Sequence, residues 1–471
     1  MESNGRLQHM LIGLRMSVLA IHACGIVIGQ DPHMQFAALT FRVAIFIIVC
    51  AAVASPALAA TSEASARRVF DEANAICMRD AGALWGHSLC GPILVVDPDD
   101  RSVVASELDI DHVLKPAGRQ FVGVLPASVI IANTPTEWSG TRWTQLIGPL
   151  LPEDDATLKV LVAHELFHRV QPDLGLARPE MPNQHLDALE GRYLLQLEWR
   201  ALAGALKART SEERLATVAD AVAFRAERYR IYPEARVEEA ALEINEGIPE
   251  YTGVMVGLEA PEERVAYALR DLSKFVDAAS FVRSFAYATG PAYGLLLDGA
   301  QPGWRGQLGS GQSLDQILST ALKLKSLERR TIAARTAQYD DGSLRATEET
   351  REQGRLAEIK TLEDRLVDGP VLKLPLARTK YQFNPQTLKP LGVHGTVYPT
   401  MRLTDAWGSL EVEDGGALVN GDTKVAFVSA AGIDAVALRG NGWKLVLNPG
   451  WKVASGPREG DYQVSPVAEA P

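Results

Sequence analysis

The chain has 471 residues, of which 47% are hydrophobic and 22% are charged, and its formal net charge is −11. This composition is ordinary for a globular protein, and the length exceeds a single hydrophobic core, so two or three domains are expected. No basic block interleaved with aromatic residues occurs in the sequence, which argues against nucleic acid as a partner.

Residues 1–60 carry the pattern of a secretory signal region. Arg42 precedes the apolar run Val43–Ala54, and Pro56 is followed by Ala-Leu-Ala. A positive charge, a short apolar segment and a small-residue cleavage site in this order are typical of a signal peptide. The apolar run is too short for a comfortable membrane span. We therefore predict cleavage after Ala59 or Ala60 and a secreted or periplasmic protein.

The signal pattern begins unusually far from the first residue, which leaves two interpretations. In the preferred one, translation starts at Met34 and the earlier residues do not belong to the protein. In the alternative, Met10–Gly29 anchors the chain in a membrane, although Arg15 and His22 interrupt its apolar character. A charge inside a span is costly, which disfavours the anchor. Contact with a membrane is expected only through this N-terminal region.

The chain contains four cysteines. Cleavage of the signal would remove Cys24 and Cys50 and leave Cys77 and Cys90. An even pair in an oxidising compartment predicts a disulfide between Cys77 and Cys90. The alternative is two free thiols.

Residues 61–150 are predicted to form an N-terminal α/β subdomain. Apolar residues at helical spacing predict a helix over residues 65–82. Trp138 and Trp143 fall in a predicted loop that leads to the next helix. Short apolar runs separated by Asp, Gly and Pro predict the strands of a small sheet at residues 92–96, 102–105, 121–125 and 127–131.

Residues 151–310 are predicted to form a mainly helical domain, with long helices near 185–206 and 233–254. A charge-rich helical segment follows at residues 311–368, with a break at Tyr339–Gly342. Residues 369–471 contain many Gly turns and predict an all-β C-terminal domain, with strands near 396–403, 425–428, 435–438 and 443–447. The predicted fold class is therefore α+β.

The sequence His164-Glu165-Leu166-Phe167-His168 is an H-E-x-x-H motif within a predicted helix. Residues four apart lie on one helix face, so both histidines can bind one ion, and the glutamate can reach a metal-bound water. This is the geometry of a zinc hydrolase. The preceding run 158–163 carries a single charge, so the helix is expected to be buried. Buried imidazoles need partners, which disfavours a solvated helix without metal.

A third ligand is needed, since catalytic zinc usually has three protein ligands. Residues 244–251 read Ile-Asn-Glu-Gly-Ile-Pro-Glu-Tyr. This segment resembles the Asn-Glu-Gly-x-Ala-Glu-Tyr sequence of the aminopeptidase N family, one of the gluzincin metallopeptidases, in which a Glu from a second helix completes the H-E-x-x-H site. The resemblance implies that Glu246 is the third ligand and that Glu250 and Tyr251 match the family's following Glu and Tyr. It also implies a thermolysin-like catalytic region.

Glu190 is the competing third ligand. It follows His168 after 21 residues, close to the spacing usual in thermolysin and aminopeptidase N, whereas Glu246 follows after 77. We prefer Glu246, because insertions between ligand helices cost little while the surroundings of a ligand set its geometry.

Residues 284–291 read Ser-Phe-Ala-Tyr-Ala-Thr-Gly-Pro. They resemble the Tyr-x-Lys-Gly segment of aminopeptidase N and glycyl aminopeptidase relatives, whose Tyr hydrogen-bonds the oxyanion. Tyr287 matches that Tyr and Gly290 the Gly, but Thr289 replaces the Lys. The alternative is that Tyr287 and Tyr293 only pack between helices. The Gly-x-Met-Glu-Asn sequence that binds the substrate amine in this family is absent. The resemblance spans residues 155–300 and supports metal chemistry, not aminopeptidase specificity.

These observations predict a secreted or periplasmic zinc metallopeptidase that hydrolyses a peptide or protein substrate. His164, His168 and Glu246 would hold Zn²⁺, Glu165 would act as general base, and Tyr287 would stabilise the oxyanion. The alternative function is a non-catalytic secreted binding protein that keeps the metal site. A hydrolase of a non-peptide bond is a third interpretation.

Overall fold

A computed structural model describes residues 63–325, 327, 329–384, 387–434 and 436–467. The predicted signal region, the start at Met34 and the alternative anchor Met10–Gly29 lie outside the described residues, as do Cys24 and Cys50. Within the described part of the chain, no helix is both long and apolar enough to cross a membrane.

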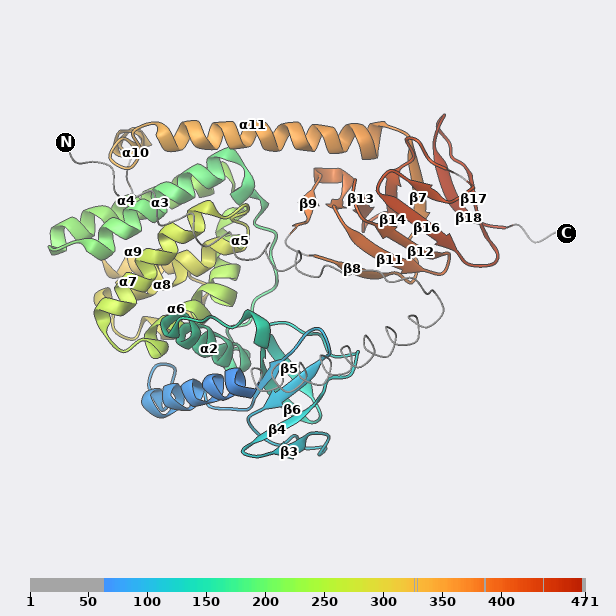
Figure 1. The fold of residues 1–471 in the computed structure, drawn as a ribbon. Coiled ribbons are helices and arrows are strands. Elements are labelled where there is room, and N and C mark those ends of the chain that lie inside the picture. The colour runs from blue at the N-terminus through green and yellow to red at the C-terminus, as the bar shows by residue number, and fades with distance from the viewer. Residues whose placement is uncertain (1–62, 326, 328, 385–386, 435, 468–471) are drawn as a thin grey trace, which may run out of the picture. The chain divides into compact units, whose positions relative to one another are not determined.

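Residues 63–80 form a helix, as predicted, and a six-stranded sheet follows in the order β3-β4-β2-β1-β6-β5 (Figure 1). Neighbouring strands are antiparallel except β1 and β6, which are parallel. The strands are β1 (Ile93–Val96), β2 (Ser102–Ala105), β3 (Lys115–Ala117), β4 (Gln120–Val124), β5 (Thr134–Trp138) and β6 (Thr141–Ile147). The predictions at 92–96, 102–105 and 121–125 are therefore confirmed.

Two predictions in this region are wrong. Residues 127–131 form a turn in place of a strand, in which the Val129 amide donates to the Pro126 carbonyl. The predicted loop around Trp138 and Trp143 is the β5–β6 hairpin. Its two-residue turn, Ser139-Gly140, has φ values of 51° and 74°. Positive φ at both central residues matches the twist of a hairpin, and Gly adopts it without strain.

The predicted disulfide between Cys77 and Cys90 is also wrong, since both cysteines are free thiols in the structure. Cys77 lies on the buried face of the 63–80 helix, and Cys90 is exposed. Burial, followed by a hydrogen bond with Cys90, raises the pKa of the Cys77 thiol to about 12. A thiol with such a pKa stays protonated and is a poor nucleophile for disulfide exchange.

Helices follow the sheet, and the predicted break at Tyr339–Gly342 separates α10 from α11. Pairs of these helices pack through small residues, as where a Cβ on Gly253 of α6 would lie 2.6 Å from the Val160 carbonyl of α2. The helices are α2 (Asp155–Val170), α3 (Leu189–Lys207), α4 (Ser211–Ile231), α5 (Ala235–Leu242), α6 (Ile248–Gly257), α7 (Pro261–Lys274), α8 (Ser284–Ala300), α9 (Leu314–Ala321), α10 (Arg329–Thr336) and α11 (Ser343–Glu363).

The C-terminal region is all-β and contains two sheets whose buried residues share one core, including Leu374, Val428, Leu403, Leu410 and Trp443. The predicted strand at 396–403 is split between the sheets, and 436–438 form a turn in place of a strand. One sheet contains β7 (Val371–Pro375), β9 (Lys389–Pro390), β10 (Thr396–Tyr398), β13 (Ala417–Asn420), β14 (Val425–Ser429), β17 (Trp451–Ser455) and β18 (Tyr462–Pro466). The other contains β8 (Lys380–Phe383), β11 (Met401–Asp405), β12 (Gly408–Val412), β15 (Arg439–Gly440) and β16 (Trp443–Leu447). The α+β class with an all-β C-terminal region is confirmed.

Helix α7 buries a carboxyl group that lacks a full set of partners. Asp271 is 2% exposed, its Oδ2 has no hydrogen-bond partner among the residues that the structure describes, and its Oδ1 lies 3.9 Å from Nε of Arg270. Burial, and after it the charge of Glu250, raises the pKa of Asp271 from 3.8 to about 8. Between these pH values the folded chain keeps a proton that the unfolded chain has lost. The free energy of unfolding therefore falls as the pH rises through this window.

Replacing Asp271 by Asn should stabilise the protein at pH 8 by a few kcal/mol, because each unit of pKa shift corresponds to about 1.36 kcal/mol. The gain should shrink towards zero near pH 4. Urea denaturation of wild type and variant at both pH values measures the difference. Asp277→Asn, on the exposed turn after α7, is the matched control and should show no such pH-dependent gain. A gain of equal size at both pH values would contradict this account.

Candidate metal centre

Helix α2 places the two histidines of the H-E-x-x-H motif on one face, where their ring nitrogens converge. The Nε2 atoms of His164 and His168 are 2.9 Å apart, and Oε2 of Glu246 lies 3.6 Å from each. In a tetrahedral zinc site with bonds of about 2.0–2.2 Å, neighbouring donor atoms are about 3.3–3.6 Å apart. These three residues are the group that could hold a metal ion within the described part of the chain.

The competing ligand Glu190 is not near this group. It lies in the first turn of α3, half-exposed, and its Oε1 pairs with Nη2 of Arg345 on α11 at 2.7 Å. The expectation based on sequence spacing is therefore wrong for Glu190, because the start of α3 packs towards α11. The glutamate of the local Asn-Glu-Gly sequence, Glu246, is the one that lies beside the two histidines.

The other nitrogen of each histidine has an acceptor that fixes its proton. His164 Nδ1 lies 2.7 Å from Oε2 of Glu250, and His168 Nδ1 lies 2.9 Å from Oε1 of Gln171. The Gln171 amide donates to the carbonyls of Leu176 and Ile244, so its oxygen must face the histidine. With Nδ1 as donor in both rings, both Nε2 lone pairs point at the same place. Metal-bound histidines are held in this way.

The carboxylates around His164 favour a positive charge where the two Nε2 atoms and Glu246 converge. Burial lowers the pKa of the imidazole, but hydrogen bonds with Glu246 and Glu250, followed by the charges of Glu250 and Glu165, outweigh it and raise the pKa of His164 to about 10. The same histidines hold the pKa of Glu246 well below its usual range, although burial opposes this. Two converging lone pairs and an ionised carboxylate in a buried site fit a divalent cation.

Glu246 lies in a single π-helical turn, Glu243–Gly247, between α5 and α6. A π turn inside an α-helix often occurs at a functional site. Here Glu246 faces the histidines while Glu243, three residues earlier, faces a separate buried cluster. Close packing against α8 holds the turn, because a Cβ on Gly290 would lie 2.1 Å from the Gly247 carbonyl oxygen. This contact explains why glycine is needed at Gly247 of the Asn-Glu-Gly sequence and at Gly290 of the segment 284–291.

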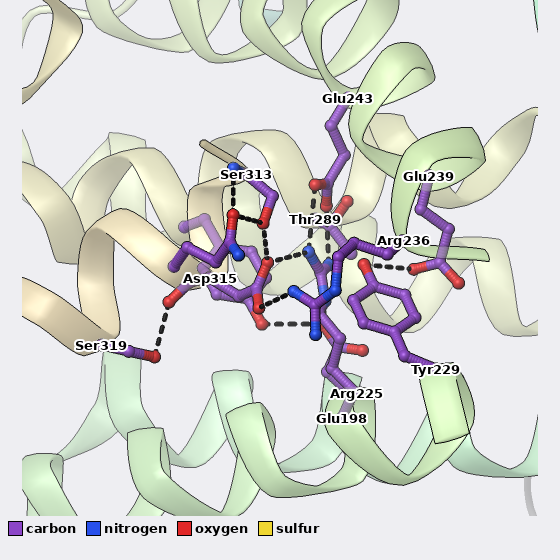
Figure 2. Close-up of polar contacts among 12 residues, drawn as sticks. Glu198, Arg225, Tyr229, Arg236, Glu239, Glu243, Thr289, Ser313, Asp315 and Ser319 are labelled. Carbon is purple, nitrogen blue, oxygen red and sulfur yellow. Dashed lines mark hydrogen bonds and ion pairs between the residues drawn. The ribbon is translucent and has the colours of Figure 1, made fainter. Parts of the chain in front are cut away.

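The cluster behind the π turn is a fully buried ionic network (Figure 2). Arg225 donates two hydrogen bonds to Glu243, at 2.6 and 3.0 Å, and one to Glu198 at 2.7 Å. Arg228 joins Glu198 to Glu239. Burial disfavours the Glu239 carboxylate, but Arg228 overcomes it and keeps the pKa of Glu239 well below its usual range. A buried network with paired charges fixes a unique geometry, here that of the helix segment that carries Glu246.

Tyr287 of α8 and Arg283, the residue that precedes this helix, contact Glu246 from the other side. The Tyr287 hydroxyl donates to Oε2 of Glu246 at 2.6 Å, and its ring stacks on His164 with 5.6 Å between centroids. Arg283 donates to Oε1 of Glu246 at 2.9 Å and to Glu180 at 3.1 Å. Tyr287 therefore lies at the site, and its hydroxyl is hydrogen-bonded to Glu246, the predicted third ligand.

Glu165 differs from the other carboxylates of the site because it lacks partners. It is 4% exposed, and its Oε2 has no hydrogen-bond partner in the described part of the chain. Burial raises the pKa of Glu165, against the opposing effect of the two histidines. It lines a pocket of about 590 Å³ together with His164, His168, Glu246 and Tyr287. A buried carboxylate without a partner lowers the stability of the fold, so its presence beside a pocket points to a function.

The sequence did not assign roles to Arg283, Gln171 or Glu250. Each of them lies one helical turn from a residue that the sequence did identify. Arg283 precedes Tyr287 by four residues. Gln171 follows His168 by three, and Glu250 follows Glu246 by four. Residues at these spacings lie on one helix face. None of these spacings shows which face meets the histidines, because that depends on packing between distant helices.

Replacing Glu250 by Gln should weaken metal binding by about 10- to 100-fold, because it removes the charged acceptor that orients His164. Gln171→Ala should act through His168 in the same way. Competition with a chelator measures the affinity of each variant. Glu262→Gln, in the exposed first turn of α7, is the control and should bind metal normally. Unchanged affinity in Glu250→Gln would show that this hydrogen bond does not orient the ligand.

No model of a known protein family, no curated protein and no solved structure matches this chain.

Proposed function

We propose that this protein is a zinc-dependent peptidase of gluzincin type that acts outside the cytoplasm, with a thermolysin-like arrangement of its catalytic helices. One observation carries the proposal. The unpaired carboxylate of Glu165 lies in a pocket next to three donor atoms, from His164, His168 and Glu246, that converge within 3.6 Å of one another. The signal pattern of residues 1–60 supports the location.

His164, His168 and Glu246 would hold the ion. Zinc in such a site supplies Lewis acidity towards a water molecule and towards the carbonyl of the substrate. The ion-binding groups are all engaged by other side chains, whereas Glu165 is not. Glu165 can therefore take the proton of the attacking water and return it to the leaving amine. Its raised pKa brings the carboxyl closer to the working range of a general base.

Tyr287 and Arg283 supply donors on the α8 side of the pocket. An oxygen that becomes negative during hydrolysis is stabilised by such preorganised donors. The Tyr287 hydroxyl donates to Glu246 in the structure, so a role at the substrate requires it to turn away from that oxygen. Arg283 donates to the other oxygen of Glu246 and can keep this carboxylate in place while the Tyr287 hydroxyl turns towards the substrate.

The position of β5 supports a peptide as the substrate. This strand is the last of the N-terminal sheet and pairs on one side with β6, while Asn133 and Thr134 at its start line the pocket. An extended peptide can add to the free edge of a strand through main-chain hydrogen bonds. Such binding would carry a peptide bond into the pocket that contains Glu165.

The proposal is tested by zinc analysis and a peptide-library assay on the purified protein. Cleavage that disappears on chelation and returns with one zinc per chain would support it. Tight zinc binding without hydrolysis of any peptide would favour the non-catalytic binding protein. Hydrolysis of esters or other bonds but not of peptides would favour the third interpretation.

Tyr287→Phe should lower turnover by about 10²- to 10³-fold if its hydroxyl is one oxyanion donor. Zinc content should stay near one per chain, since Glu246 keeps Arg283. Steady-state kinetics on an identified substrate measure the effect. Tyr381→Phe, on a half-exposed strand of the C-terminal region, should have normal activity. Normal turnover in Tyr287→Phe would leave Tyr287 with a packing role against His164.

A further inference from the structure

A second cavity lies apart from the metal centre, between the ends of six helices, α3, α4, α6, α7, α8 and α9. Its volume is about 640 Å³, within the range of roughly 300–1,000 Å³ found for sites that hold small ligands. It shares no lining residue with the pocket of Glu165. Neither the metal site nor the proposed peptidase function uses it.

The wall of this cavity is mainly apolar. Leu215 of α4 lines it and is 43% exposed. Further large apolar residues of the wall come from α3, α4, α6, α7 and α8 and include Leu206, Val218, Met255, Val265, Leu295 and Leu296. A ligand with a hydrocarbon portion would remove this surface from water.

Three cations interrupt the apolar wall: Arg214, Arg264 and Lys323. Within the described residues, none of the three forms an ion pair with a carboxylate. The single carboxylate of the wall, Asp298, is bound by Arg305 at 2.6 Å and is thereby neutralised. The cavity therefore carries an excess of positive charge in a chain whose formal net charge is −11. Unpaired cations beside an apolar cavity are suited to an anion with an apolar body.

We propose that this cavity binds a single-chain fatty acid. The carboxylate would pair with Arg264, Arg214 and Lys323, and the hydrocarbon chain would lie on the apolar wall. A neutral alcohol of equal length would fill the same wall but leave the cations unpaired. A short carboxylate such as acetate would pair with the cations but bury little surface. The site therefore requires both features in one ligand.

Isothermal titration calorimetry with the full-length protein tests this, using octanoate, decanoate and dodecanoate below their micelle-forming concentrations. Each methylene group is worth about 0.8 kcal/mol, so affinity should rise about fourfold for each one added. Dodecanol should bind at least tenfold more weakly than dodecanoate. Peptidase activity does not enter the measurement, so failure of the proposed function would leave this test intact.

Arg264→Gln and Lys323→Gln should each weaken dodecanoate binding by about tenfold and leave dodecanol binding unchanged. Leu215→Glu, which adds a negative charge at an exposed position of the wall, should abolish dodecanoate binding without affecting the fold. Arg119→Gln, on an exposed hairpin of the N-terminal sheet, is the control. Equal binding of dodecanol and dodecanoate, or normal dodecanoate binding by all three variants, would overturn the proposal. So would the absence of binding by the whole series.

Discussion

Replacing Glu165 by Gln should lower peptide hydrolysis by at least about 10²- to 10⁴-fold while the protein keeps its fold and about one zinc per chain. Gln has the size of Glu and can still form hydrogen bonds, but it cannot accept the proton of the attacking water. The structure explains why zinc should be retained. Glu250, Gln171 and Tyr287 form the hydrogen bonds that hold the three ion-binding residues in place. Within the described part of the chain, Glu165 shares no hydrogen bond with these groups, so its replacement leaves the three ion-binding residues held.

The fold of the variant should also be intact, because the carboxylate that it removes is buried and unpaired. Loss of such a charge is neutral or stabilising in general. Thermal unfolding and zinc content should therefore be measured beside steady-state kinetics. Glu107→Gln, an exposed residue of the N-terminal region, is the matched control. Near-normal hydrolysis by Glu165→Gln on an identified substrate would refute the mechanism, whatever its zinc content.

The sequence predicted local structure well where one segment determines it. The spacing of His164 and His168 on one helix follows from the periodicity of α2 alone, and the helix has a local start signal as well. Asp154 caps it by accepting the Thr157 amide at 2.9 Å. The same is true of β14 and β16 in the C-terminal region, which match the strands predicted at 425–428 and 443–447 and contribute to the shared core.

Prediction failed where structure depends on contacts between distant segments. The spacing rule favoured Glu190 because it assumed a short connection, whereas α3, α4 and α5 lie between the two ligand-bearing helices. The sequence predicts a loop around Ser139-Gly140, whereas two residues with positive φ form the turn of a hairpin there. The ionic network of Arg225 and Arg228 joins four helical segments, and no local pattern shows which of their charges meet.

The π turn Glu243–Gly247 is another feature that depends on contacts between distant segments. The Asn-Glu-Gly sequence pointed to Glu246, and the structure shows what Asn245 and Gly247 on either side of it contact. Asn245 exchanges two hydrogen bonds with the backbone of Arg178, and Gly247 allows close contact with Gly290 of α8. The turn itself could not be predicted, because it depends on Arg225 holding Glu243 on the opposite side.

Replacing Glu246 by Gln should cost at least about 10²-fold in zinc affinity, more than the loss of an outer partner such as Glu250. Gln keeps the size of the side chain, and its single carbonyl oxygen can still accept a hydrogen bond from either Tyr287 or Arg283, which donate to opposite oxygens of Glu246. It lacks the negative charge that balances the ion. The stabilisation of the fold by zinc should fall in parallel, because a ligand that binds only the folded chain contributes about 2.7 kcal/mol at one hundred times its Kd.

The control is Glu190→Gln, which should bind zinc as tightly as wild type. Glu190 pairs with Arg345 on the surface of α3 and has no contact with the histidines. Chelator competition gives the affinity, and the shift of the melting temperature on adding zinc gives an independent measure that requires no substrate. If Glu190→Gln lost zinc while Glu246→Gln kept it, the third ligand would be the one suggested by sequence spacing. The helix that carries the glutamate would then have to move in the metal-bound protein, and the π turn would lose its assigned role.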